Sequence, residues 1–219
     1  MEKYVITIGR EFGSGGLDVG RMLSDSLKIK CYDKELLSMA AKESGLCQEI
    51  FENHDEKPTN SFLYSLVMDT YSVSGYTSAP FLDMPLNHKV FLAQFETIKN
   101  LADKESCIIV GRCADSILAD MENRLSVYIY APYEKRFANC TKILKMEEKV
   151  ARRMIREVDR SRELYHRRYC PEYTDPFSNR DLLIDSSRFG IEKTAEMLSE
   201  IVRDLFVSGD EKEKWNAAT

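Results

Sequence analysis

The sequence predicts an α/β protein in which a five-stranded parallel sheet is covered by helices on both faces. Five short apolar segments are continuous rather than alternating, which is typical of strands buried on both faces. Segments with helical spacing of apolar residues separate them, and this alternation favours parallel strands joined by helical crossovers. The chain has 219 residues, so we expect a single domain over 1–219.

The expected strands cover residues 4–8, 29–32, 107–110, 125–130 and 182–184. Helices are expected after residue 16, through residues 33–41 and 90–102, from residue 132 onward, and over residues 147–169 and 191–205. Pro132 suits a helix start, because the first N–H groups of a helix have no partner inside it. Residues 45–85 hold glycines, prolines and an apolar helical piece, and we interpret them as a helical insertion within the domain. The tail, residues 208–219, is polar.

Composition excludes several classes of protein. The chain has 31 Lys and Arg against 36 Asp and Glu, a net charge of −5, so nucleic acid is not expected as a partner of the whole molecule. The apolar runs are too short for a membrane helix or a signal peptide. Six cysteines without a CxxC pair and three scattered histidines do not indicate a metal site. We therefore expect a cytoplasmic protein with reduced thiols, and the sequence gives no signal of its oligomeric state.

The strongest local signal is the segment GREFGSGG, residues 9–16, between a strand and a helix. Its glycines let N–H groups converge on an anion, and the helix start adds partial positive charge, so a phosphate suits it better than a simple turn. The segment departs from the motif G-x-x-x-x-G-K-[ST], because Gly16 stands at the lysine position and Leu17 at the hydroxyl position. Our hypothesis is that Arg10 supplies the missing charge and Ser14 a hydroxyl.

Charged residues also follow three other expected strands, at Asp33, Arg112 and Asp185. The carboxyl ends of parallel strands meet at one edge of the sheet, where ligands bind. The Arg112 guanidinium suits a phosphate or carboxylate ligand, or alternatively a structural ion pair with a neighbouring acid. Asp33 suits a substrate hydroxyl, a base or hydrated Mg²⁺, and it also suits the cap of the following helix.

Residues 151–169 carry seven arginines against three acidic residues. Arg153, Arg156 and Arg160 have helical spacing, so we expect them to share a face that clamps a transferring phosphoryl group. Two alternatives remain open. The segment could be a solvated helix with many ion pairs, or a nucleic-acid patch with its tyrosines as stacking groups.

Together these segments resemble the cytidylate kinase-like family of nucleoside monophosphate kinases, from residue 4 to about residue 206. The resemblance is carried by GREFGSGG, CYDKELL, HDEKPTNSFLYSL, FLAQ, IIVGRCADSIL, VYIYAP and DRSRELYHRRY…LLIDSSRFGIE. It implies a three-layer P-loop kinase fold with a monophosphate-binding insertion at about residues 45–85 and an arginine-rich lid at about residues 147–172. The chain lacks the loop lysine of ordinary cytidylate kinases, and the aspartate that they have near the end of the strand that here ends in Tyr130.

The resemblance implies Mg²⁺-dependent transfer of the γ-phosphoryl group of ATP to a nucleoside monophosphate, CMP or dCMP in the founding members. Two alternatives are a kinase of a non-nucleotide small molecule and a nucleotide-binding regulatory protein without catalysis. The expected ATP-binding residues are Gly13, Ser14, Gly15, Gly16 and Leu17. The expected catalytic residues are Arg10, Arg112, Arg156, Arg160 and Arg162. Acceptor binding is expected from Asp33, Arg112 and Asp185, and no residue is expected to ligate a metal.

Overall fold

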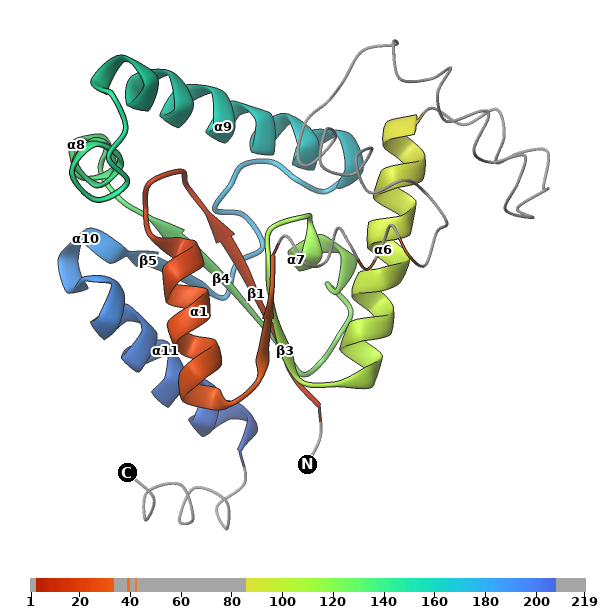
Figure 1. The fold of residues 1–219 in the computed structure, drawn as a ribbon. Helices are drawn as coiled ribbons and strands as arrows, with labels where there is room; N and C mark the ends of the chain where they lie inside the picture. The colour runs from red at the N-terminus through yellow and green to blue at the C-terminus, as the bar shows by residue number, and fades with distance from the viewer. Residues whose placement is uncertain (1–2, 34–38, 40–41, 43–85, 208–219) are drawn as a thin grey trace.

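The computed structural model describes residues 3–33, 39, 42 and 86–207 (Figure 1). The insertion expected at residues 45–85 and the polar tail at residues 208–219 lie outside the described residues. The helix expected through residues 33–41 also lies almost entirely outside them. All statements below concern the described part of the chain.

The described strands form one parallel sheet in the order β2-β3-β1-β4-β5. They are β1 (Val5–Arg10), β2 (Lys30–Tyr32), β3 (Cys107–Val110), β4 (Arg124–Tyr130) and β5 (Leu182–Asp185). The central strand β1 pairs with both β3 and β4, and Val5 lies opposite both Cys107 and Arg124. The predicted five-stranded parallel sheet is therefore confirmed, with the end of β1 in the middle of the carboxyl edge.

Helices cover both faces of the sheet (Figure 1). On one face lie α1 (Gly16–Leu27) and α11 (Ile191–Phe206), with α10 (Ser186–Phe189) leading into α11. On the other face lie α6 (Leu86–Lys104) and α7 (Ala114–Ile117). The carboxyl edge is covered by α9 (Glu148–Tyr169), which follows α8 (Tyr133–Ala138) and the π-helical turn η2 (Asn139–Ile143).

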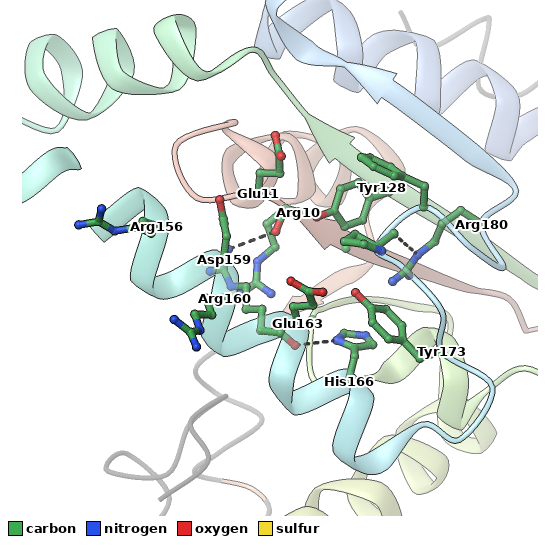
Figure 2. Close-up of a pocket in the computed structure, with 15 residues that line it drawn as sticks. Arg10, Glu11, Tyr128, Arg156, Asp159, Arg160, Glu163, His166, Tyr173 and Arg180 are labelled. Carbon is green, nitrogen blue, oxygen red and sulfur yellow. Dashed lines mark hydrogen bonds between the residues drawn. The ribbon is translucent and has the colours of Figure 1, made fainter. Parts of the chain in front are cut away.

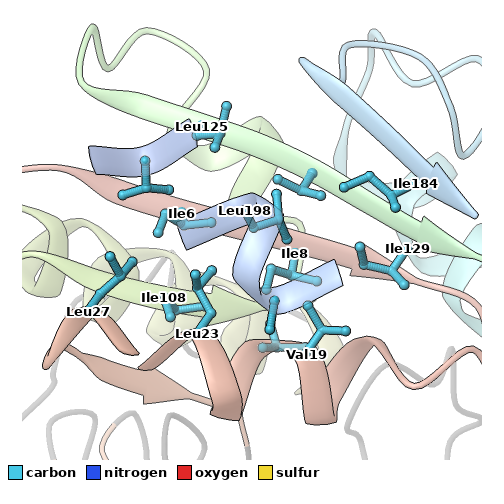
Figure 3. Packing of buried hydrophobic residues seen from close by; sticks show 14 of the residues in the cluster. Ile6, Ile8, Val19, Leu23, Leu27, Ile108, Leu125, Ile129, Ile184 and Leu198 are labelled. Carbon is cyan, nitrogen blue, oxygen red and sulfur yellow. The ribbon is translucent and has the colours of Figure 1, made fainter. Parts of the chain in front are cut away.

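Alternate side chains of the strands enter two separate hydrophobic cores. Ile6 and Ile8 of β1 pack in the core with α1 and α11, where Leu198 is fully buried (Figure 3). Val5 and Ile109 belong to the second core, which contains residues of α6 and α7. Burial on both faces explains why these strands are continuous apolar runs in the sequence.

The structure extends β1 two residues beyond the expected range, because Gly9 and Arg10 continue the ladder opposite Tyr128 and Ile129 of β4. Pro132 precedes α8 as expected. The short elements α7, η2 and α10 were not expected, since four or five residues carry too little periodicity to be recognised. In the described part of the chain, no helix is long and apolar enough to cross a membrane.

Replacement of a core side chain on α11 tests this packing. Leu198→Ala should lower the free energy of unfolding by about 2–5 kcal/mol, because it removes a buried side chain and leaves a cavity. Leu205→Ala is the matched control on the same helix, where the leucine is 58% exposed. Urea denaturation measures both, and equal losses for the two variants would contradict the assigned core.

Candidate active site

The loop between β1 and α1 ends in an uncapped helix start. Gly15 precedes α1 with φ 81° and ψ 7°, in the left-handed region that favours glycine, and no side chain caps the helix there. A Cβ on Gly15 would also lie 2.7 Å from Cδ1 of Ile191, so a larger residue would require that side chain to shift. The first N–H groups of α1 have no partner within the helix. This helix start therefore has the character of an anion site.

Gly16 explains the missing lysine in steric terms. A Cβ built on Gly16 would lie 2.6 Å from Cβ of Arg10 and 3.2 Å from Cβ of Ile129. A lysine at this position would push the first turn of α1 away from the end of β1. The base of the Arg10 side chain therefore lies directly against the first turn of α1. Only 11% of the Arg10 side chain is exposed.

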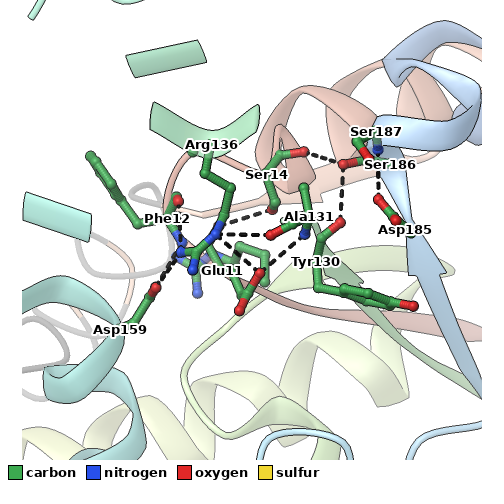
Figure 4. Close-up of polar contacts among 12 residues, drawn as sticks. Glu11, Phe12, Ser14, Tyr130, Ala131, Arg136, Asp159, Asp185, Ser186 and Ser187 are labelled. Carbon is green, nitrogen blue, oxygen red and sulfur yellow. Dashed lines mark hydrogen bonds and ion pairs between the residues drawn. The ribbon is translucent and has the colours of Figure 1, made fainter. Parts of the chain in front are cut away.

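A buried arginine ties the loop to α9 (Figure 4). Arg136 of α8 donates to the carbonyl oxygens of Ala131 at 3.0 Å and Phe12 at 3.2 Å. It also pairs with Glu11 at 3.2 Å and with Asp159 of α9. The other oxygen of the Asp159 carboxylate accepts the N–H of Phe12 at 2.7 Å. The position of α9 is thus coupled directly to the backbone of the loop.

Glu11 belongs to the same cluster. Burial raises the pKa of its carboxyl group, although the N–H of Ala131 and the charge of Arg136 both favour the ionised form. The N–H of Ala131 donates to Glu11 Oε2 at 3.0 Å. Glu11 therefore joins the end of β1 to the turn after β4.

Two expected ligand groups make structural contacts. The Ser14 hydroxyl donates to the Glu11 carbonyl oxygen at 2.9 Å, inside the loop. The Asp185 carboxylate caps α10 by accepting the N–H of Ser187 at 2.9 Å. Because Asp185 ends the edge strand β5, the sheet order separates it from Asp33, which follows the opposite edge strand β2. The side chain of Leu17 packs against the core of α1 and α11.

The structure does bring Arg10, Asp33 and Arg112 together at the ends of β1, β2 and β3. Arg112 donates to Asp33 Oδ1 at 3.1 Å and to the Val110 carbonyl oxygen at 3.1 Å. Arg10 lies 3.9 Å from the same Asp33 oxygen. The Arg112 side chain is only 1% exposed, so the ion pair that the sequence analysis gave as an alternative is present.

A cavity of about 530 Å³ lies between the sheet's carboxyl edge and α9 (Figure 2). This volume is within the range of small-molecule sites, about 300–1,000 Å³. Four predicted arginines line it: Arg10, Arg156, Arg160 and Arg162. The other lining residues are Gly9, Glu11, Gly111, Tyr128, Asp159, Glu163, His166, Tyr173, Pro176, Phe177 and Arg180. Arg112 and residues 13–17 are not part of this lining.

The arginines of α9 divide between two roles. Arg162 donates to the Arg10 carbonyl oxygen at 3.2 Å, at the cavity wall. Arg153, expected to share the cavity face, instead lies outside the lining and pairs with Glu157 at 3.7 Å. Arg152 similarly pairs with Glu148 on the exposed surface. Arginines that line the cavity and arginines in surface ion pairs therefore lie on different parts of one helix.

The sequence analysis missed a buried cluster of three charged residues beside the cavity. Asp115 of α7 lies 3.2 Å from Nε2 of His166 on α9 and 2.9 Å from a guanidinium nitrogen of Arg180. Burial raises the pKa of Asp115, but the His166 hydrogen bond and the Arg180 charge outweigh it and lower the pKa to about 2. Burial lowers the pKa of His166, but the hydrogen bond and charge of Asp115 raise it overall. The cluster attaches the end of α9 to α7.

The His166–Asp115 pair gives the stability a defined pH dependence. A raised His166 pKa contributes stability below the ordinary value of 6.5, and this contribution is lost as the pH rises through the folded-state pKa. The lowered Asp115 pKa contributes stability above 3.8, which is lost as the pH falls towards 2. Between pH 3.8 and 6.5, the free energy of unfolding of the wild type should therefore exceed that of His166→Gln by about 2 kcal/mol. At higher pH the difference should be smaller.

Urea denaturation across a pH series measures this difference. His88→Gln, at an exposed histidine of α6, is the control and should not reproduce the pH dependence. A His166→Gln deficit that grows above pH 6.5 would contradict the assignment, because it would require a lowered pKa.

Comparisons with known proteins agree with this architecture. A comparison with curated proteins gives no match. An uncharacterized protein from Eubacterium ventriosum is 26% identical with a TM-score of 0.66, over 91% of this chain and 98% of that chain. Shikimate kinase from Bacteroides thetaiotaomicron is 12% identical with a TM-score of 0.52, over 91% of this chain and 98% of that chain, and this likeness concerns the fold alone.

The family comparison covers both the loop after β1 and the arginine-bearing helix. Residues 5–188 match the model of the cytidylate kinase-like family. This range begins at the first residue of β1 and extends through α9 and β5 into α10. The sequence resemblance and the predicted three-layer fold of P-loop kinases are therefore confirmed, and this chain belongs to the cytidylate kinase-like family.

Proposed function

We propose that this protein transfers the γ-phosphoryl group of ATP to a nucleoside monophosphate, with CMP and dCMP as the first acceptors to test. One observation carries the proposal: a cavity lined by five arginines, four of them predicted from the sequence, lies between α9 and the end of β1, where the glycine loop begins. Membership of a kinase-like family supports a phosphotransferase. Phosphoryl transfer needs an anion-binding loop and cationic groups near it, and the glycine loop with the adjacent arginine-lined cavity supports this assignment.

The loop after β1 fits the triphosphate of ATP. Its glycine backbone and the uncapped start of α1 offer N–H groups to phosphate oxygens, and Arg10 adds a full charge beside them. Bound Mg²⁺ would neutralise charge on the phosphates. Mg²⁺ usually keeps several waters and binds substrate phosphates together with one or two carboxylates.

The acceptor would lie in the cavity, with its phosphate facing Arg10, Arg156, Arg160 and Arg162. Arg112 lies next to this position, at the end of β3, and Asp33 holds its guanidinium. In our proposal the acceptor phosphate competes with Asp33 for Arg112. The two substrates would then meet around Arg10, because Gly9, Arg10 and Glu11 are the residues of the loop that also line the cavity.

In this arrangement the protein contributes position and charge rather than covalent chemistry. The α9 helix covers the cavity, which limits access of water to the phosphates. Asp159 holds α9 on the loop through the N–H of Phe12, and Arg162 holds it on the Arg10 carbonyl oxygen. These contacts would keep Arg156 and Arg160 over the phosphates while charge redistributes between donor and acceptor.

A panel of acceptors tests the activity directly. The purified protein is incubated with Mg·ATP and CMP, dCMP, UMP, AMP, GMP or a non-nucleotide hydroxy acid such as shikimate, and ADP release is followed by a coupled assay. Acceptor-dependent ADP release with a nucleoside monophosphate supports the proposal. Release only with the hydroxy acid would assign a small-molecule kinase instead, and tight ATP binding without turnover would assign a non-catalytic nucleotide-binding protein.

Arg160→Ala should lower kcat/KM about 100-fold or more, because a guanidinium facing the cavity would stabilise charge that develops in the transition state. Arg153→Ala is the matched control on the same helix, since its 59% exposed side chain pairs with Glu157 outside the cavity. The coupled assay measures both variants. Equal losses would indicate a general effect of charge on α9 and remove Arg160 from the proposed clamp.

Arg10→Ala should raise the dissociation constant for ATP about tenfold or more, because it removes the charge that replaces a loop lysine. Isothermal titration calorimetry measures ATP binding without any acceptor. Arg21→Ala, at a 65% exposed arginine of α1, should bind ATP like the wild type. Unchanged ATP binding in a folded Arg10→Ala protein would refute the role assigned to Arg10.

A further inference from the structure

The cavity has two chemically different ends (Figure 2). Arg156 and Arg160 of α9 lie at one end, whereas Tyr128, Tyr173 and Arg180 lie at the other (Figure 2). The second end is completed by Phe177, Pro176 and His166. Phosphate recognition accounts for the first end, but it does not require an aromatic wall.

The aromatic end is built from two elements far apart in the sequence. Tyr128 of β4 is buried, and the ring of Phe177 meets its ring edge to face at a centroid distance of 5.4 Å. Phe177 nevertheless remains 45% exposed. Tyr173 packs against the His166 ring at a centroid distance of 5.0 Å. An exposed phenylalanine beside a cavity is a surface on which another planar ring can stack.

Polar contacts hold this wall in place. The Arg180 guanidinium lies over the Tyr128 ring, 5.5 Å from its centroid, and pairs with the buried Asp115 at 2.9 Å. Asp175 Oδ1 accepts the N–H groups of Phe177 at 2.8 Å and Ser178 at 3.0 Å, which fixes the turn that carries the Phe177 ring. The aromatic surface is therefore preorganised, which reduces the ordering that a ligand must impose.

We infer that the wall formed by Tyr128, Tyr173 and Phe177 binds the base of the acceptor nucleotide, while the arginine end binds its phosphate. The inference rests on the proposed function and specifies which part of the acceptor lies where. Aromatic side chains stack on any nucleobase, because every base has a π face. A cavity of about 530 Å³ with one cationic and one aromatic end matches a monophosphate joined to a planar ring.

The position of the wall assigns this base to the acceptor rather than to ATP. The cavity meets the glycine loop only at Gly9, Arg10 and Glu11, and residues 13–16 lie outside its lining. The triphosphate that the proposed function places on the loop therefore lies beyond the end of the cavity. A ring inside the cavity belongs to the molecule whose phosphate faces Arg156 and Arg160.

Phe177→Ala tests the inference by calorimetric titration of the full-length protein with CMP, ribose 5-phosphate and ATP separately. We expect CMP binding to weaken about tenfold, since base–aromatic stacking is lost. Ribose 5-phosphate, which has the sugar phosphate but no base, should bind both proteins equally and more weakly than CMP binds the wild type. ATP binding should not change. Phe189→Ala is the matched control, because Phe189 of α10 is 49% exposed and does not line the cavity.

Each other outcome overturns the subsite. Equal losses for CMP and ribose 5-phosphate would show that Phe177 only supports the fold of its loop. A loss for ATP instead of CMP would place the donor base on the wall. Wild-type protein that binds CMP no better than ribose 5-phosphate would have no base subsite in the cavity. Turnover is a separate measurement: the predicted CMP binding without phosphoryl transfer would refute the proposed kinase activity and leave the subsite standing.

Discussion

The structure depends on how closely the first turn of α1 packs on the last residue of β1. A Cβ on Gly16 would lie 2.6 Å from Cβ of Arg10, so this position holds no side chain. The loop can therefore offer main-chain N–H groups but no lysine of its own. Positive charge must come from the strand before the loop and from a helix far along the chain, and both sources line the same cavity.

The position of α9 decides which of its arginines line the cavity. Two ion pairs are among the contacts that hold the helix at the carboxyl edge of the sheet: Asp159 bonds to the loop and to Arg136, and His166 bonds to Asp115. Both ion pairs are largely shielded from solvent, where removing one partner leaves the other charge poorly solvated and unpaired. The cationic cavity thus forms in a chain with a net charge of −5, because local ion pairs decide which arginines face inward.

The same buried contacts also connect the aromatic wall of the cavity to α9. Arg180 pairs with Asp115 and also lies over Tyr128, so the aromatic wall and the end of α9 share one buried carboxylate. At the end of β3, next to the cavity-lining Gly111, Asp33 similarly pairs with Arg112. Two acidic residues, Asp115 and Asp33, therefore hold arginine side chains in place, and through Arg180 the first also supports the Tyr128 ring.

The sequence alone determined the parallel sheet, because strands buried on both faces must be continuously apolar. It also located the glycine-rich loop, because the glycines and the helix start are adjacent in the chain. It also placed Asp33, Arg112 and Asp185 at strand ends on one edge of the sheet. Only the tertiary structure separated Asp185 from the other two, since the strand order puts β2 and β5 at opposite edges. Likewise, Asp115 and His166 lie 51 residues apart. Their contact forms only when α9 packs over the sheet, so no local sequence pattern predicts it.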